Sequence, residues 1–275
     1  MKNLDLHIHS TASDGSLSYK QIIDTACTLN ISVISITDHD NVDSLGDAEE
    51  YSSGKPVKFI PGVEISVDVD RGDFHLLGYG IDYRNERLVN MLSDLKNERK
   101  NRVKKIITAM NNAGIDISFS DIKNNDDSSA LGKPHIAEAL IAKGYAYSKD
   151  EAFNVFFKKG AVGDIPKKKV TPEEALDLVI KAGGIPVLAH PASLLLNADD
   201  FNPFIQKMIV LGLRGIEVYS NMHSNSDVDF YYKTAIVNQL FITGGSDFHT
   251  PEHDRFCYYG NDRLIPAEKI NLPLM

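Results

Sequence analysis

Histidine and carboxylate side chains follow several short apolar runs of this 275-residue chain, at points where β-strands would end. His7 and His9 lie two residues apart in LDLHIHS, so on a strand both imidazoles point to the same face. Asp247 and His249 have the same spacing in GSDFH. The residues of these types near the other apolar runs are Asp14, Asp38, His39, Asp40, Glu64, His75 and His190.

Neutral imidazole and carboxylate are the side chains that bind zinc, manganese or iron without thiols. A single histidine at a strand end is more often an ordinary polar residue than a ligand. Six of the nine histidines, however, stand at these positions. Several buried imidazoles and carboxylates converging without a metal would carry a large desolvation cost. We therefore expect a site for divalent metal ions. Cys27 and Cys257 are the only cysteines, too few for a disulfide framework or a cysteine zinc clamp.

Strands and helices alternate through most of the chain, and this alternation predicts where the polar residues sit. Strands are expected at residues 4–8, 31–38, 57–66, 74–81, 184–191, 213–220 and 240–247. Helical patterns include residues 18–30, with Ser18 as N-cap, and residues 172–184, with Pro172 at the start and Gly183 at the stop. Repeated β–α alternation favours an α/β fold with a parallel sheet, and at this length a TIM-like barrel. Barrels of that class carry their sites at the C-terminal ends of the strands.

The middle of the chain departs from this rhythm. Residues 85–169 contain no convincing strand, but a long charged helix that stops at Gly114 and further helical segments at residues 135–145 and 151–160. We expect residues 1–84 and 170–275 to form the barrel and residues 85–169 to form a helical insertion subdomain. That insertion is either a solvated cover or a lid that supplies basic residues to the active site.

The net charge and the distribution of apolar residues bear on the partners and the location of the protein. The formal net charge of −9 argues against a broad electrostatic grip on duplex DNA, but allows a short anionic substrate held by local bases and metals. Neither a signal peptide nor a membrane-spanning apolar run is evident, which predicts a cytoplasmic protein without a membrane partner. The oligomeric state stays open between a monomer and a small homo-oligomer.

The order of the motifs resembles the PHP (polymerase and histidinol phosphatase) family. The matching segments are HIHSTASDG, TDHD, PGVEIS, HLLGYGID, VLAHP, GIEVYS and GSDFH. The chain is most similar to the TrpH/YciV-like branch of metal-dependent phosphoesterases, which includes nucleoside 3′,5′-bisphosphate phosphatases. The resemblance implies a distorted (β/α)7 TIM-like barrel with a trinuclear metal site. We therefore expect two to three divalent ions (Mn²⁺, Fe²⁺ or Zn²⁺).

The resemblance also implies which residues bind each ion. His7, His9, Glu64 and Asp247 would hold the first ion, and His75 and His190 would hold the second with Glu64 as a bridge. Asp14, His39 and His249 would hold the third. Asp5, Asp38 and Asp40 are candidates for orienting imidazoles by hydrogen bonds, or equally for capping loops and strand ends.

A metal cluster of this kind activates water for in-line attack on phosphorus and neutralises the phosphoryl oxygens. Asp247 and His223 are the catalytic candidates, with His223, in YSNMHS, either donating a proton to the leaving group or binding phosphate. A surface loop histidine is the alternative. The candidates for phosphate binding in the insertion are Arg99, Arg102, Lys133 and His135. Related enzymes commonly carry arginine where Lys133 stands, and lysine lacks the bidentate fork.

The expected function is hydrolysis of a phosphate monoester on a small nucleotide, with a nucleoside 3′,5′-bisphosphate favoured and short 5′-phosphorylated oligonucleotides as a related substrate. Three alternatives remain. Histidinol-phosphate phosphatase shares the barrel and the metals, a non-catalytic metal-stabilised interaction module would need no substrate, and an amidohydrolase would act on a C–N bond. Amidohydrolases usually carry a carbamylated lysine bridge where Glu64 stands here.

Overall fold

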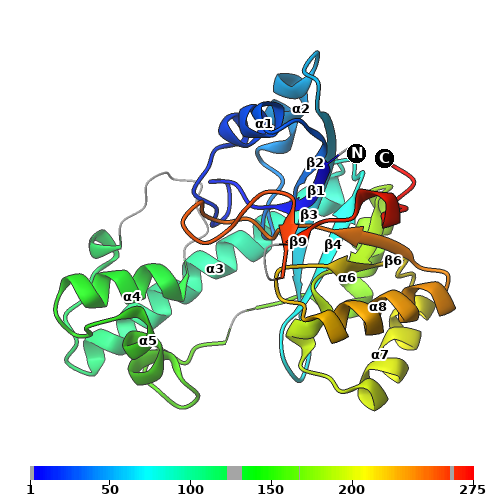
Figure 1. The fold of residues 1–275 in the computed structure, drawn as a ribbon. Coiled ribbons are helices and arrows are strands. Elements are labelled where there is room, and N and C mark those ends of the chain that lie inside the picture. The colour runs from blue at the N-terminus through cyan, green and yellow to red at the C-terminus, as the bar shows by residue number, and fades with distance from the viewer. Residues whose placement is uncertain (1–2, 123–131, 167, 261–262) are drawn as a thin grey trace. The chain divides into compact units, whose positions relative to one another are not determined.

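The computed structural model describes residues 3–122, 132–166, 168–260 and 263–275. The chain divides into two compact units (Figure 1). Unit 1 comprises Met1–Leu92 and Lys169–Met275, and unit 2 comprises Ser93–Lys168. Unit 2 lies within residues 85–169, where the sequence placed the insertion. Near the start of that range, Leu88 and Leu92 are buried residues of unit 1.

Unit 1 is built on a seven-stranded sheet in which neighbours in sequence are also neighbours in space, in the order β1 to β7. The strands are β1 (Asn3–Ile8), β2 (Ile31–Ile36), β3 (Lys58–Val67), β4 (Phe74–Tyr79), β5 (Ile185–Leu188), β6 (Gly215–Tyr219) and β7 (Phe241–Gly244). All seven overlap the strands expected from the apolar runs. The mixed α/β class is therefore confirmed.

Strand β4 corrects the expectation of an all-parallel sheet. It pairs antiparallel with both β3 and β5, whereas β1–β2, β2–β3, β5–β6 and β6–β7 are parallel pairs. The connection from Val67 to Phe74 is too short for a crossover helix, so the chain turns back on itself. The C-terminal end of β3 and the N-terminal end of β4 consequently lie side by side.

The first and last strands are also linked. Ile8 and Phe248 form an isolated parallel bridge, with the N–H of His9 donating to the carbonyl of Phe248 over 2.9 Å. This bridge joins the end of β1 to the segment that follows β7, and it brings the two histidine- and aspartate-bearing ends of the chain together.

Helices cover the strands of unit 1, with α1 packing on β2, α2 on β3, α6 on β5 and α8 on β6. Their bounds are α1 (Tyr19–Thr28), α2 (Leu45–Ser52), α6 (Pro172–Lys181), α7 (Ala198–Val210) and α8 (Asn225–Val237). Local sequence explains the ends. The predicted N-cap Ser18 forms a capping box with Gln21, and Pro172 occupies the first turn of α6. Gly183 ends α6 at a φ of 75°, a left-handed conformation that glycine adopts without strain.

Unit 2 has its own apolar core. It contains most of α3 (Glu86–Asn112), together with α4 (Lys133–Ala142), α5 (Lys149–Ala152) and a following π-helical turn, Phe153–Phe157. Ile106, Met110, Ile136 and Leu140 are fully buried at its centre. Within the described ranges, none of the helices is both long and apolar enough to cross a bilayer.

Candidate metal centre

The strand ends of unit 1 converge on one cluster of imidazoles and carboxylates. All nine residues expected as metal ligands have ligand atoms in groups whose members lie within 4.8 Å of one another. The groups are His9 with Asp14, His39 and His249; His7 with Glu64 and His190; His7 with His9 and Asp247; and His39 with Glu64 and His75. These groups share members, so the nine residues form a continuous cluster.

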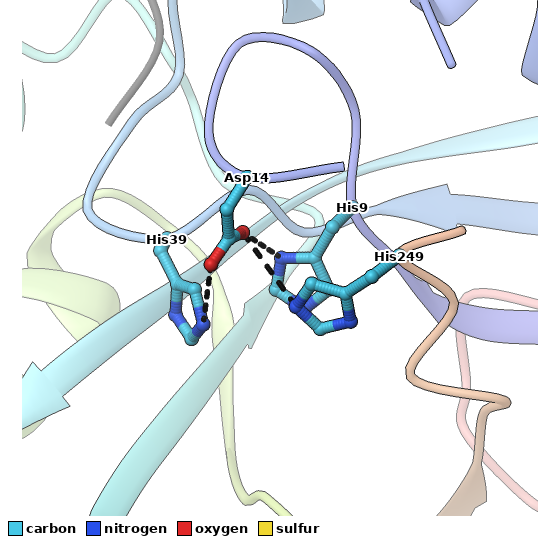
Figure 2. A group of neighbouring side chains, drawn as sticks. All are labelled: His9, Asp14, His39 and His249. Carbon is cyan, nitrogen blue, oxygen red and sulfur yellow. Dashed lines mark ion pairs between the residues drawn. The ribbon is translucent and has the colours of Figure 1, made fainter. Parts of the chain in front are cut away.

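Asp14 is at the centre of the first group (Figure 2). Its Oδ1 lies 3.6 Å from both His9 Nδ1 and His249 Nε2, and its Oδ2 lies 3.8 Å from His39 Nε2. These residues come from the end of β1, the loop after it, the loop after β2 and the segment after β7. The Asp14 side chain is 39 % exposed, so this part of the cluster faces solvent.

Glu64 joins the remaining groups from a fully buried position on β3. Its Oε1 lies 3.0 Å from both His75 Nδ1 and His190 Nε2. Its Oε2 lies 2.8 Å from His39 Nδ1, 3.3 Å from His9 Nε2 and 3.4 Å from His7 Nε2. One carboxylate therefore contacts five imidazoles, the geometry expected of a bridging ligand.

Asp247 supplies the second carboxylate for the histidine pair on β1. Its Oδ1 lies 3.0 Å from His9 Nε2 and 3.3 Å from His7 Nε2. The expected same-face arrangement of His7 and His9 is present, with ring centroids 5.1 Å apart.

Hydrogen bonds on the outer nitrogens orient several of these rings. His190 Nδ1 lies 3.1 Å from Ser193 Oγ, which itself donates to the carbonyl of Asp73. The serine oxygen therefore accepts from His190 Nδ1–H, and Nε2 is left to face Glu64. His249 Nδ1 is 2.8 Å from the carbonyl of Asp247, which likewise directs Nε2 toward Asp14. An outer hydrogen bond of this kind fixes the ring nitrogen available to a metal.

Glu217 is a functional candidate that the sequence analysis missed. It is completely buried on β6, with Oε1 3.0 Å from His7 Nδ1 and Oε2 accepting from the backbone N–H of His190 over 2.8 Å. An acidic residue inside the apolar run GIEVYS was the available signal, because a buried carboxylate requires specific partners.

The three aspartates considered for orienting imidazoles have other partners. Asp5 accepts from Ser246 and from the backbone N–H of Cys257, Asp38 accepts from the hydroxyls of Ser10 and Ser13, and Asp40 accepts from Ser66. These bonds fit the alternative of loop and strand-end capping.

The carboxylates and imidazoles of the cluster shift one another's pKa values. Burial raises the pKa of Glu64, but the imidazoles of His39, His75 and His7 outweigh it and hold that pKa well below its ordinary value. Burial lowers the pKa of His7, but Glu217 and Asp247 outweigh it and hold the pKa well above its ordinary value. Without a metal, protons on histidine therefore balance the carboxylates.

The residues present fit divalent metal ions. His7 Nε2 and Glu64 Oε2 are buried, and neither makes a hydrogen bond of acceptable geometry within the described part of the chain. Both atoms instead face the ligand atoms of neighbouring residues, where a bound cation would satisfy them. A cluster of imidazole nitrogen and carboxylate oxygen suits Zn²⁺, Mn²⁺ and Fe²⁺.

His223 is buried next to this cluster and is not a surface loop histidine. Its Nδ1 is 2.8 Å from the carbonyl of Val218, so it donates there, and its Nε2 lies 3.5 Å from the backbone nitrogen of Ala192. Burial lowers the pKa of His223. The contact with Val218 places a ring proton on Nδ1, and Nε2 faces the backbone N–H of Ala192 as an acceptor.

The basic candidates of the insertion lie in unit 2. Arg102 donates from Nε to the carbonyl of Ile165 over 2.7 Å, and Lys133 Nζ lies 3.3 Å from the carbonyl of Phe157. Burial and the neighbouring charge of Arg99 lower the pKa of Arg102, and burial and Arg102 lower that of Lys133. Arg102 thus lies close enough to both Arg99 and Lys133 for the like charges to repel. His135 Nδ1 accepts from the backbone N–H of Gly132, where α4 begins.

Comparison with known proteins identifies the family. The model of the PHP domain matches residues 5–182, so the chain belongs to the PHP domain family. It is 30 % identical over 252 residues to the 3′,5′-nucleoside bisphosphate phosphatase of Chromobacterium violaceum, covering 91 % of this chain and 88 % of the relative. It is also 30 % identical over 249 residues to the 5′-3′ exoribonuclease Rnm of Escherichia coli, covering 90 % of this chain and 85 % of the relative.

Solved structures with the same fold include a protein of Chromobacterium violaceum described as an amidohydrolase with bound sulfate and no metal. It matches with a TM-score of 0.81 and 29 % identity over 92 % of this chain and 89 % of the other. A Bifidobacterium adolescentis protein assigned as a metal-dependent phosphoesterase matches with a TM-score of 0.79 and 25 % identity, over 98 % and 92 % of the two chains.

Proposed function

We propose that this protein is a metal-dependent phosphoesterase that removes a phosphate from a small nucleotide. A nucleoside 3′,5′-bisphosphate is the favoured substrate, and short 5′-phosphorylated oligonucleotides are a related one. The observation that carries this proposal is the convergence of nine histidine and carboxylate side chains at the strand ends of a PHP domain. The two relatives named as a bisphosphate phosphatase and an exoribonuclease support the nucleotide class.

We further propose that the sheet of unit 1 forms a distorted (β/α)7 barrel, with the cluster at one end. The bridge between Ile8 and Phe248, at the two edges of the sheet, supports this closure. The insertion, proposed as residues 85–169, would act as a lid carrying the phosphate-binding side chains. A cytoplasmic location is part of the same proposal.

Divalent ions would be held in three positions. The first takes His7, His9, Glu64 and Asp247; the second takes Glu64, His75 and His190; the third takes Asp14, His39 and His249. When bound, these ions supply Lewis acidity that activates water and neutralises phosphoryl charge. Mn²⁺, Fe²⁺ and Zn²⁺ all suit this ligand set.

The protein side chains have distinct roles in this mechanism. Arg99, Arg102, Lys133 and His135 supply positive charge or N–H donors for the substrate's phosphates. With its own proton on Nδ1, His223 would take up a second proton from solvent onto Nε2, which the negative charge of a bound phosphoryl group favours. That proton would pass to the leaving oxygen as the P–O bond breaks.

The decisive experiment offers metal-loaded protein four substrates: adenosine 3′,5′-bisphosphate, 5′-AMP, histidinol phosphate and a short 5′-phosphorylated RNA. Released phosphate is measured for each. We expect the bisphosphate to have the highest kcat/KM. Preference for histidinol phosphate would overturn the nucleotide proposal, and no release from any substrate would favour the non-catalytic module.

A further inference from the structure

Glu217 lies behind the metal centre and contacts two histidines at once. Its two oxygens are 3.0 Å from His7 Nδ1 and 2.8 Å from the backbone nitrogen of His190. The rings of His7 and His190 are nearly parallel, with centroids 5.6 Å apart and an interplanar angle of 20°. Both present Nε2 to Glu64, which approaches from the other side.

Both groups that Glu217 contacts are donors. The backbone N–H of His190 can only donate, and His7 must carry its proton on Nδ1 if Nε2 is to bind a metal. A carboxylate accepts both bonds. Glutamine has the same shape but one oxygen, so it satisfies one partner and turns an N–H₂ group toward the other. Faced with that amide, His7 Nδ1 becomes an acceptor, and its proton moves to the metal-binding nitrogen.

The two histidines belong to different proposed metal positions, His7 to the first and His190 to the second. We infer that Glu217 is a positioning residue that couples these positions, fixing the His7 tautomer and the His190 backbone together, so that both sites become competent or fail as a pair. This inference rests on the metal centre of the proposed function. The hydrogen bonds of Glu217 reach His7 and His190, so its effect on the third position would be indirect, through Glu64 and His9.

Metal titration of the full chain tests the coupling. Metal-free wild type and E217Q are titrated with Zn²⁺ by calorimetry, and bound metal is counted by mass spectrometry after gel filtration. We expect E217Q to bind two of its three ions about 10–100-fold more weakly. Both losses should occur in the same step, with a smaller effect on the third ion.

Asp5→Asn is the matched control. Asp5 is equally buried and accepts from Ser246 Oγ and from the backbone N–H groups of Ser246, Cys257 and His7, but from no imidazole, so it differs from Glu217 in the contact with a histidine ring. This variant should have a lower melting temperature, because hydrogen bonds are lost. Its affinity for Zn²⁺ should stay within about threefold of the wild-type affinity.

The results of the titration distinguish failure of the coupling from failure of the proposed function. E217Q titrating like wild type, or losing a single ion, overturns the coupling. Wild type that binds the metals but releases no phosphate overturns the proposed function and leaves the coupling intact. Wild type that binds no metal overturns both. If E217Q does not fold, ¹⁵N-histidine NMR of Zn²⁺-loaded wild type decides: His7 must be protonated on Nδ1, and ligation through Nδ1 overturns the inference.

Discussion

Glu64 Oε1 and His75 Nδ1 lie 3.0 Å apart because β3 and β4 run in opposite directions. In a parallel sheet the start of one strand lies far from the end of its neighbour. Here Ser66, near the end of β3, is opposite His75, near the start of β4. The hairpin thus brings to the metal centre a histidine that a parallel strand would have placed at the opposite edge of the sheet.

Removing the charge of Glu64 should abolish activity. In Glu64→Gln, five imidazoles lose the carboxylate that contacts them, and we expect kcat/KM to fall at least about 100-fold with loss of bound metal. Steady-state phosphate release and metal content check this. Glu173→Gln, on the exposed side of α6, is the control and should match wild type. Full activity of Glu64→Gln would remove the bridging role.

His223→Asn should affect substrates according to their leaving groups. Loss of a general acid costs about 10²–10⁴-fold for a ribose alkoxide. 4-Nitrophenyl phosphate, whose leaving group needs no proton, should lose far less. His253→Asn, at an exposed histidine, is the control. An equal loss for both substrates would indicate phosphate binding instead of proton transfer.

The basic residues of unit 2 should affect substrate binding. Arg99→Ala and Lys133→Ala are each expected to raise KM for the bisphosphate by about tenfold, the loss of one charge-assisted hydrogen bond of about 1.5 kcal/mol. Lys104→Ala, at an exposed position of the same long helix, should leave KM unchanged. Unchanged KM in both site variants would remove the insertion from substrate recognition.

Gly245 should tolerate no side chain. A Cβ there would collide with Cβ and the backbone of His7, so Gly245→Ala must displace the first ligand strand. We expect a loss of about 1–3 kcal/mol in the free energy of unfolding, measured by urea denaturation, and weakened metal binding. Gly46→Ala is the control, because a Cβ on this α2 residue makes an ordinary 3.4 Å contact with Tyr83 and alanine favours helix.

Metal affinity should fall with decreasing pH. Burial lowers the pKa of His190, but Glu64 outweighs it and raises the pKa above its ordinary value, as Glu217 and Asp247 do for His7. Binding metal must displace these protons. Each displaced proton should lower the affinity about tenfold per pH unit below the histidine pKa, measured by calorimetry in several buffers. A pH-independent affinity would contradict the protonated metal-free cluster.

Much of this protein was readable from its sequence. The apolar runs located all seven strands, because burial of a strand demands apolar residues whatever its neighbours are. Residue type and placement at strand ends also identified the nine side chains of the cluster, since imidazole and carboxylate rarely gather without a ligand. The helix ends at Ser18 and Pro172 followed from local capping chemistry.

Only the tertiary structure decided the rest. The direction of β4 depends on the turn between Val67 and Phe74. The residue types in this turn do not show whether the chain reverses or crosses over. Glu217 owes its role to partners 210 and 27 residues away, which no local pattern encodes. His223 likewise became a buried imidazole through packing against distant segments. Sequence specifies which groups can do chemistry, whereas hydrogen bonds between remote segments determine each group's orientation and proton.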